Sequence, residues 1–217
     1  GFARKRDMIV GHKVSGTGLA SDARVSVARI GVIGGGIAGA SVAAGLVRRG
    51  TEVMILEDGP GLANAASGNR LALQSPRLAV DHNPASRLSA TCLAFAAALS
   101  DKAGASVAAP VLALDWPARE AERHAKFRRQ SWPDELAQDL SADSASVQSG
   151  VAIHLPAMRH DYGRVIKPAK LIAWLAEGSS VTTDFGVASC MQNDHGITIT
   201  ADNGRQERFD AIVLANG

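Results

Sequence analysis

The chain has 217 residues, of which 46% are hydrophobic and 20% are charged, with 22 glycines and 8 prolines. These values are those of one large globular domain, or of one domain with tails, and they exclude a disordered, collagenous or coiled-coil chain. The 23 basic side chains exceed the 21 acidic ones by a net charge of only +2. That slight excess permits an acidic partner such as RNA without requiring one.

The order of the chain predicts a tail, a linker and one domain. Residues 1–9 are basic, and residues 10–27 are rich in Gly, Ser and small polar residues, which is typical of a linker. The expected ordered domain covers residues 28–217. Because the chain begins with Gly and ends on an apolar segment followed by a turn, we expect it to be part of a larger protein.

The first predicted unit is a strand, a turn, a helix and a second strand. Residues 28–33 form a short apolar segment that predicts a strand, and three consecutive glycines follow as a tight turn. Residues 37–49 predict a helix with a small inward face, and residues 52–57 predict the next strand. A strand–turn–helix–strand order within about thirty residues is a βαβ unit with parallel strands.

A longer and more polar stretch follows the βαβ unit. We expect a loop to about residue 77, then a helix over about residues 84–100 with an apolar face formed by Leu88, Cys92, Phe95 and Leu99. The remaining predicted elements are a strand at 107–114, a charged helix at 117–130, a short helix after Trp132, a polar loop at 141–150, a strand at 153–165, a helix opening at Pro168, and strands at 181–183, 187–191, 197–201 and 211–214.

The glycines of the first turn form a dinucleotide-binding fingerprint, Gly34-x-Gly36-x-x-Gly39. In this motif one glycine permits the tight turn, the next lets the backbone approach a pyrophosphate, and the third lets helix and strand pack closely. The N-terminus of the following helix favours the negative charge of the phosphates. We therefore predict that the cofactor contacts Gly34, Gly35, Gly36, Ile37, Ala38 and Gly39.

Glu57 ends the second strand about twenty residues later, where a carboxylate accepts the ribose hydroxyls and repels a 2′-phosphate. This predicts FAD or NAD rather than NADP. Ala43, Leu46, Gly50 and Val53 extend the same fingerprint, which disfavours the alternative of a glycine-rich turn in an ordinary α/β core. The motif alone does not separate a flavin from a nicotinamide cofactor, since both carry the same adenosine pyrophosphate.

The segment 65–70, with the sequence AASGNR, resembles the loop after the second strand in the amine and amino-acid oxidase flavoproteins. Residues 66–70, the N-terminal residues 1–8 and the terminal residues 212–217 are similar to segments of the bifunctional tRNA 5-methylaminomethyl-2-thiouridine biosynthesis family. The resemblance implies a Rossmann-type α/β FAD-binding domain with inserted β-rich elements of a substrate domain, incomplete at the C-terminus. It also implies FAD contacts at Ser67, Gly68, Asn69, Arg70, Val187, Ala215, Asn216 and Gly217.

This sequence departs from the family pattern in two places. Residues 71–76 read LALQSP where the family has Gln-Gly and an aromatic–proline pair, and Arg164 replaces a tryptophan after Gly163. The resemblance nevertheless implies an activity: oxidation of the carboxymethylaminomethyl group on the wobble uridine of tRNA. The carboxymethyl group leaves as glyoxylate, and a fused methyltransferase domain then uses S-adenosylmethionine.

Other functions stay open at this point. A free-standing FAD oxidase of small amines or amino acids, such as glycine or sarcosine, fits the fingerprint equally well but not the basic N-terminal residues. A non-catalytic nucleotide-binding module is an alternative of another class, and a nicotinamide enzyme is less favoured because of the segment 65–70. We expect tRNA as the partner, and no membrane and no metal.

Several side chains outside the fingerprint were weighed for function. His154, His160 and Asp161 would make an acid–base cluster, but histidines near strand ends are more often surface or packing residues. Arg128 and Arg129 near Trp132 would suit RNA phosphates and base stacking, although a solvated helix end is favoured.

The cysteines and the hydropathy pattern bear on compartment. Cys92 and Cys190 form no CxxC pair, so we expect neither a disulfide framework nor a zinc site, and we expect both side chains in the core. No apolar run reaches the about 20 residues of a membrane span, and no signal peptide is recognisable. These features predict a cytoplasmic protein.

Overall fold

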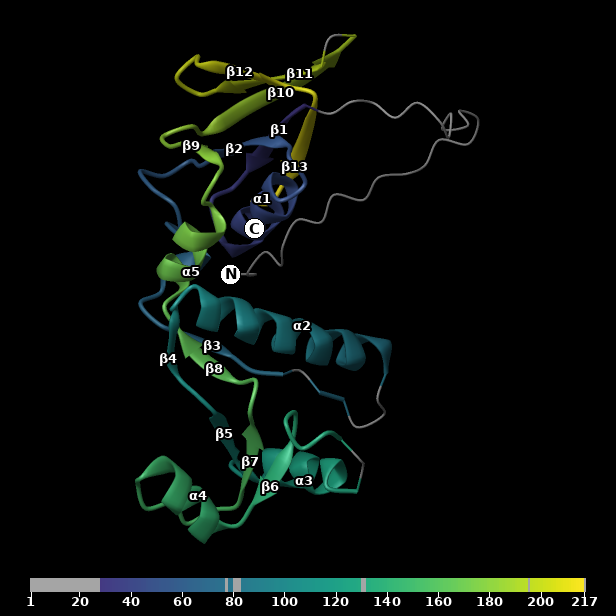
Figure 1. Cartoon of the computed structure of the whole chain (residues 1–217), viewed down its shortest axis with the longest axis vertical. Helices are drawn as coiled ribbons and strands as arrows, with labels where there is room; N and C mark the ends of the chain where they lie inside the picture. The colour runs from purple at the N-terminus through teal and green to yellow at the C-terminus, as the bar shows by residue number, and fades with distance from the viewer. Residues whose placement is uncertain (1–27, 77, 80–82, 130–131, 195, 217) are drawn as a thin grey trace, which may run out of the picture. The chain divides into compact units, whose positions relative to one another are not determined.

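The computed structural model describes residues 28–76, 78–79, 83–129, 132–194 and 196–216, and it divides into two compact units (Figure 1). The first unit comprises Gly1–Asn64 with Leu175–Gly217, and the second comprises Ala65–Trp174. The expected tail and linker at residues 1–27 lie outside the described residues. The fold of the described part is α/β, and the predicted Rossmann-type domain is confirmed in the first unit.

A parallel sheet forms the centre of the first unit. Its strands are β1 (Arg29–Ile33), β2 (Glu52–Leu56), β9 (Ser180–Thr182) and β13 (Ala211–Leu214), in the order β13-β1-β2-β9. Helix α1 (Ile37–Val47) connects β1 to β2, as the βαβ pattern predicts. The last strand in the sequence therefore lies beside the first, which brings the carboxyl ends of β1, β2 and β13 to one edge.

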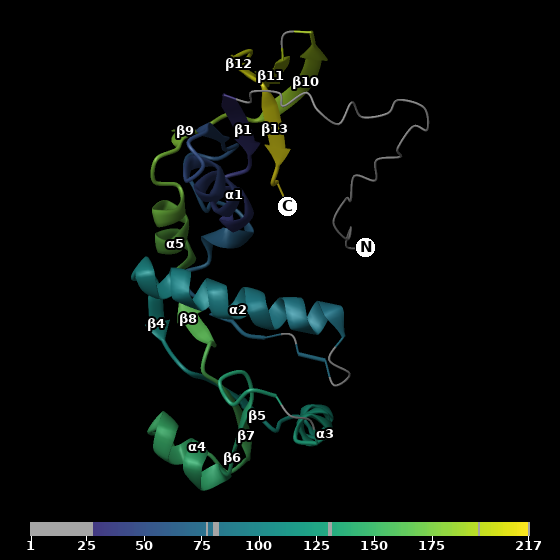
Figure 2. The same ribbon diagram turned by 45° about the vertical axis from the view of Figure 1, so that its right-hand side comes forward.

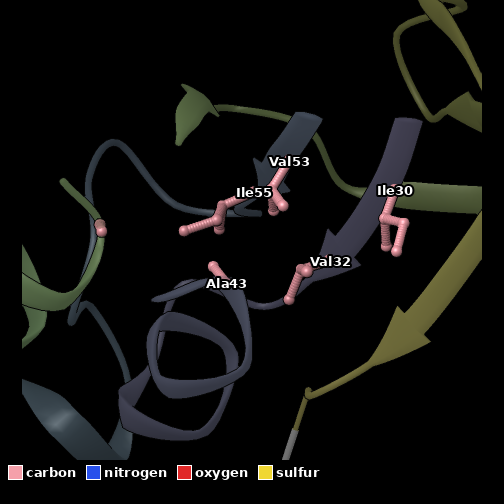
Figure 3. Close-up of a cluster of buried hydrophobic side chains, with 6 residues drawn as sticks. Ile30, Val32, Ala43, Val53 and Ile55 are labelled. Carbon is pink, nitrogen blue, oxygen red and sulfur yellow. The ribbon is translucent and has the colours of Figure 1, made fainter. Parts of the chain in front are cut away.

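Small side chains on α1 let the helix approach the sheet closely. Ala43 lies against Val32 and Ile55, and all three side chains are fully buried (Figure 3). Each fully buried aliphatic side chain of Val or Ile stabilises the fold by about 1.5–3 kcal/mol. The core of this layer thus combines branched side chains from the strands with alanines from the helix.

The opposite face of the parallel sheet carries a second, antiparallel sheet. It consists of β10 (Val187–Asn193), β11 (Gly196–Ala201) and β12 (Gln206–Phe209). Phe209 packs there so closely that a Cβ on Gly31 would lie 2.8 Å from its ring. Strand β12 was not predicted, because its sequence QERF has no apolar alternation.

Two small antiparallel sheets and the helices α2 to α5 make up most of the described part of the second unit. One sheet has the order β3-β8-β4, formed by Ala72–Gln74, Arg164–Ile166 and Ser106–Ala108, and α2 (Pro84–Lys102) lies along it (Figure 2). The other sheet has the order β5-β7-β6, formed by Val111–Leu114, Ala157–His160 and Gln138–Leu140. The other helices are α3 (Ala118–Phe127), α4 (Ala142–Ser149) and α5 (Pro168–Leu175), which ends at the boundary between the units, and the loop after β2 contains the 3-10 turn Ala66–Gly68.

The predicted inward face of α2 is wrong. Leu88 and Phe95 are 65% and 62% exposed, and Cys92 is exposed as well. The buried face of the helix instead carries Ser86, Ala90, Leu93, Ala97 and Ser100. This face is formed mostly by small side chains, so a hydropathy pattern weighted by the largest residues selects the wrong side.

The prediction that Cys190 lies in the core is also wrong. Cys190 is exposed, as is every residue of β10.

Several predicted elements of the second unit are corrected by the structure. The expected polar loop at 141–150 contains α4, which Ser141 caps by accepting the N–H of Ser144 and which Gly150 ends in a left-handed conformation. The expected helix after Trp132 is a turn that leads into β6. The expected strands at 107–114 and 153–165 are each replaced by two shorter strands, and β3 lies inside the segment expected to be a loop.

Candidate dinucleotide site

The turn after β1 is built on backbone contacts that exclude side chains. Gly34 has a φ of +111°, and a Cβ at this position would lie 2.8 Å from the carbonyl oxygen of Ala215. The N–H of Gly34 donates to the carbonyl of Leu56 at 2.8 Å, while the N–H of Ala215 donates to the carbonyl of Ile33 at 2.8 Å. The turn is therefore held between the ends of β2 and β13.

Gly39 brings the first turn of α1 against that same loop. A Cβ on Gly39 would lie only 1.9 Å from the carbonyl oxygen of Gly34, a distance that no side chain tolerates. Gly36 is the N-cap residue and supplies no side-chain hydrogen bond, and the first turn of α1 has no acidic residue. The N-terminus of α1 thus lies at the glycine turn without a side-chain cap or an acidic neighbour in its first turn, and a helix N-terminus favours phosphate.

Glu57 is attached to the glycine turn through its carboxylate. Oε2 accepts the N–H of Gly35 at 2.6 Å, and Oε1 accepts the N–H of Gly59 at 3.1 Å. A Cβ on Gly35 would lie 2.7 Å from Oε2, so a side chain at this position would displace the carboxylate. A carboxylate has about four acceptor sites, so lone pairs remain for the hydroxyls of a ribose.

A neighbouring loop that the sequence analysis did not single out supports the site. Ala63 has a positive φ of 60°, and its N–H donates to the carbonyl of Gly35 at 3.0 Å. The loop after β9 also contacts this region, since Phe185 donates its N–H to the carbonyl of Glu57 at 3.0 Å. No sequence motif marks Ala63, because only its backbone takes part.

Most of the cofactor contacts predicted in the first unit lie around the glycine turn. Gly34, Gly35, Glu57, Ala215 and Asn216 lie together, with the backbone nitrogen of Asn216 3.0 Å from the Cβ position of Gly34. Val187 opens β10 two residues after Phe185 and is 38% exposed. Gly217 lies outside the described residues.

The contacts predicted from the segment 65–70 lie in the second unit. Ser67 is half-buried, while Gly68, Asn69 and Arg70 are exposed. The side-chain amide of Asn69 donates to the carbonyl of Ala66 at 3.3 Å, which holds the 3-10 turn. Their role in binding the cofactor stays a prediction.

The weighed acid–base cluster does not form. His154 is exposed, Asp161 pairs with Arg159, and His160 is 5% exposed with Nδ1 on the carbonyl of Leu136. The less favoured RNA patch is not supported at Arg128, because this guanidinium pairs with Asp115 and Asp139. Arg164, which replaces the family tryptophan, donates two hydrogen bonds to Asp101 at 3.1 and 3.0 Å.

The cradle of the first unit fits an adenosine pyrophosphate, because three glycine positions leave no room for a side chain and a carboxylate faces the turn. Residues 29–217 match the model of the family described as FAD dependent oxidoreductase (DAO). The chain belongs to this family, and its cofactor is FAD. It is an oxidoreductase domain.

Curated proteins that are similar to this chain carry a more specific name. A tRNA 5-methylaminomethyl-2-thiouridine biosynthesis bifunctional protein MnmC from Marinobacter nauticus is 28% identical over 222 residues, covering 100% of this chain and 35% of the relative. The protein of the same name from Vibrio cholerae is 31% identical over 183 residues, covering 79% of this chain and 27% of the relative. The chain thus spans about a third of the length of the curated relatives it matches.

Among solved structures, glycine oxidase from Geobacillus kaustophilus is similar, with a TM-score of 0.68 and 22% identity over 88% of this chain and 56% of that one. At this identity the likeness shows the shared fold. Among the described residues no helix is long and apolar enough to cross a membrane.

Proposed function

We propose that this chain is the FAD-binding part of an enzyme that oxidises the carboxymethylaminomethyl group on the wobble uridine of tRNA. The observation that carries the proposal is the match, over the whole of this chain, to part of proteins named for tRNA 5-methylaminomethyl-2-thiouridine biosynthesis, within an FAD dependent oxidoreductase family. A tRNA substrate would place the protein in the cytoplasm. A fused methyltransferase domain that uses S-adenosylmethionine belongs to the same proposal.

The residues of the first unit have defined tasks in this function. The backbone of the turn at residues 34–36 and the first turn of α1 would hold the pyrophosphate of FAD, and Glu57 would accept hydrogen bonds from the ribose. When bound, FAD would supply the acceptor for a hydride from the carboxymethyl carbon next to the amine nitrogen, and water would hydrolyse the resulting imine to an aminomethyl group and glyoxylate. The protein therefore needs to bind, orient and desolvate the amine.

An anaerobic absorbance titration tests this function. The FAD-loaded protein is mixed with tRNA that carries carboxymethylaminomethyluridine, and the flavin bands near the visible maximum are followed while glyoxylate is measured. Bleaching with this tRNA, but not with unmodified tRNA, glycine or sarcosine, is the expected result. Bleaching by glycine or sarcosine alone would replace the proposal with a small-amine oxidase, and flavin that no amine reduces would indicate a non-catalytic domain.

A further inference from the structure

A pocket lies wholly within the second unit and takes no part in the dinucleotide site. Its volume is about 260 Å³, and it is lined by side chains of α3, β5, β7 and the segment after β3. Drug-sized ligands occupy pockets of about 300–1,000 Å³, so this one has room for a single ring with a short substituent. Its lining combines apolar walls with two buried histidines, which is an unusual use of buried space.

His160 presents a hydrogen-bond acceptor to the pocket. Its Nδ1 lies 2.5 Å from the carbonyl oxygen of Leu136, and a carbonyl only accepts, so Nδ1 carries the proton. Burial lowers the pKa of His160, and the nearby His124 and Arg123 lower it further, so the ring is neutral at pH 7. Its Nε2 is then an acceptor, and among the described residues no hydrogen bond reaches it.

The second buried histidine, His124, contacts a carboxylate through its Nδ1. Its side chain is 4% exposed, and Nδ1 lies 2.6 Å from Oδ1 of Asp115. Oδ2 of Asp115 accepts from Arg128 at 2.8 Å, which fixes the carboxylate in turn. Asp115 therefore takes up Nδ1 of His124, and the ring of this histidine forms part of the pocket lining.

The charged groups around the pocket do not favour an anion. The guanidinium of Arg123 pairs with Glu120 at 2.8 Å and donates to the carbonyl of Leu78 at 3.2 Å. Arg128 lies between two carboxylates, those of Asp115 and Asp139. Both guanidinium groups are therefore already paired with carboxylates, so neither is an open partner for a carboxylate or phosphate ligand.

We propose that this pocket binds an amine carried on a planar or apolar group, with an N–H donor on Nε2 of His160. An amine N–H is a donor, which complements the acceptor at Nε2 of His160. Phe127 and Met158 form the buried apolar wall, and Trp116, 71% exposed, supplies an aromatic surface for a ring or a cation. The inference rests on the proposed function for its ligand class, since that function acts on an amine attached to a uracil ring.

Three probes that share one ring test the ligand class. Benzylamine, benzyl alcohol and benzoate are titrated by calorimetry into the anaerobic, FAD-loaded protein. We expect benzylamine to bind at least about tenfold more tightly than benzoate, because benzoate offers no donor to Nε2. Equal or tighter binding of benzoate would overturn the proposal.

Two variants locate the binding. His160→Leu removes one acceptor and should weaken benzylamine about tenfold, whereas His154→Leu, at an exposed histidine, should leave it unchanged. If His160→Leu fails to fold, Trp116→Ala at an exposed position serves instead and should weaken benzylamine and benzyl alcohol alike. Unchanged benzylamine affinity in the folded variant would place the amine elsewhere and overturn the proposal.

The experiment separates this inference from the proposed function, because binding is measured without flavin reduction. Amine binding in a protein whose flavin is not reduced by modified tRNA would leave the pocket assigned and refute the tRNA oxidation. The opposite outcome would refute the pocket alone. In that case a folded His160→Leu or Trp116→Ala variant would bind benzylamine as tightly as the wild type, and modified tRNA would still reduce its flavin.

Discussion

A hydrogen bond of 2.6 Å joins the backbone N–H of Gly35 to Oε2 of Glu57. Since Oε1 of the same carboxylate accepts the N–H of Gly59 at 3.1 Å, one side chain connects the turn after β1 with the loop after β2. Both oxygens are thus held in place by backbone donors. The acidic residue of the fingerprint is therefore a structural part of the glycine turn as well as a candidate ribose ligand.

Replacement of Glu57 by glutamine tests both roles. In Glu57→Gln one oxygen becomes an NH₂ group, which would face a backbone N–H, so one of the two hydrogen bonds is lost. A hydrogen bond to a charged group contributes about 1.5–3 kcal/mol, and we expect the Kd for FAD to rise about tenfold or more. Fluorescence titration of the apoprotein with FAD measures this change.

Glu52→Gln is the matched control, because Glu52 is the first residue of β2, which Glu57 follows. Its side chain is 67% exposed and forms an ion pair with Arg29 at 3.1 Å. An exposed ion pair contributes about 0–1 kcal/mol, so FAD affinity should not change. Wild-type FAD affinity in Glu57→Gln would show that the carboxylate has no part in the cofactor site.

A single methyl group at Gly39 should abolish FAD binding. The Cβ of Gly39→Ala would lie 1.9 Å from the carbonyl oxygen of Gly34, and the clash can be relieved only if α1 moves away from the turn. We expect the purified variant to lack the visible flavin bands. Gly45→Ala, on the same helix, is the control, since its Cβ would lie 3.6 Å from the flexible end of Arg49.

The control should also be slightly more stable, by up to about 1 kcal/mol, because alanine is a better helix former than glycine. Thermal unfolding of both variants is measured beside the flavin content. A Gly39→Ala protein that retains a stoichiometric amount of FAD would contradict the close approach of α1 to the glycine turn.

The buried His160 should make the second unit sensitive to mild acid. Burial lowers its pKa in the folded protein, whereas an unfolded histidine has a pKa of about 6.5. As the pH falls below about 6.5, the unfolded state gains a proton that the folded state does not bind, so stability is complete above this pH and declines below it. One such proton changes the free energy of unfolding by at most about 1.4 kcal/mol per pH unit.

Urea unfolding between about pH 7.5 and 5.5, where carboxylates stay ionised, measures this slope. Tryptophan fluorescence reports on the second unit, since Trp116, Trp132 and Trp174 all lie in it. His160→Gln should flatten the slope, and His154→Gln, at an exposed position, should not. An unchanged slope in a folded His160→Gln protein would assign the pH dependence to other groups.

The dinucleotide fold could be predicted from the sequence because its requirements are local. Gly34, Gly39 and Glu57 stand at spacings that only the strand–turn–helix–strand arrangement explains, and the structure places them at one sheet edge. The supporting loop could not be predicted, since Ala63 acts through its N–H alone. Backbone contacts between distant segments leave no residue-type signal.

The second unit was harder to predict because its elements are short and depend on tertiary contacts. Strands of three or four residues carry too little alternation to be recognised, and α4 has a serine-rich sequence that is equally typical of a loop. The pocket was missed as well. His124 and His160 are 36 positions apart in the sequence and meet only because α3 packs near β7.

The two faces of α2 provide a direct test of how the helix packs. Leu93 is 6% exposed, whereas Leu88, five residues earlier, is 65% exposed. The same Leu→Ala change at the two positions removes the same atoms from different surroundings. Leu93→Ala should lower the free energy of unfolding by about 2–5 kcal/mol, and Leu88→Ala should change it by no more than about 0.5 kcal/mol. Urea unfolding of this 217-residue chain measures both, and a larger loss at Leu88 than at Leu93 would restore the apolar face that hydropathy predicts.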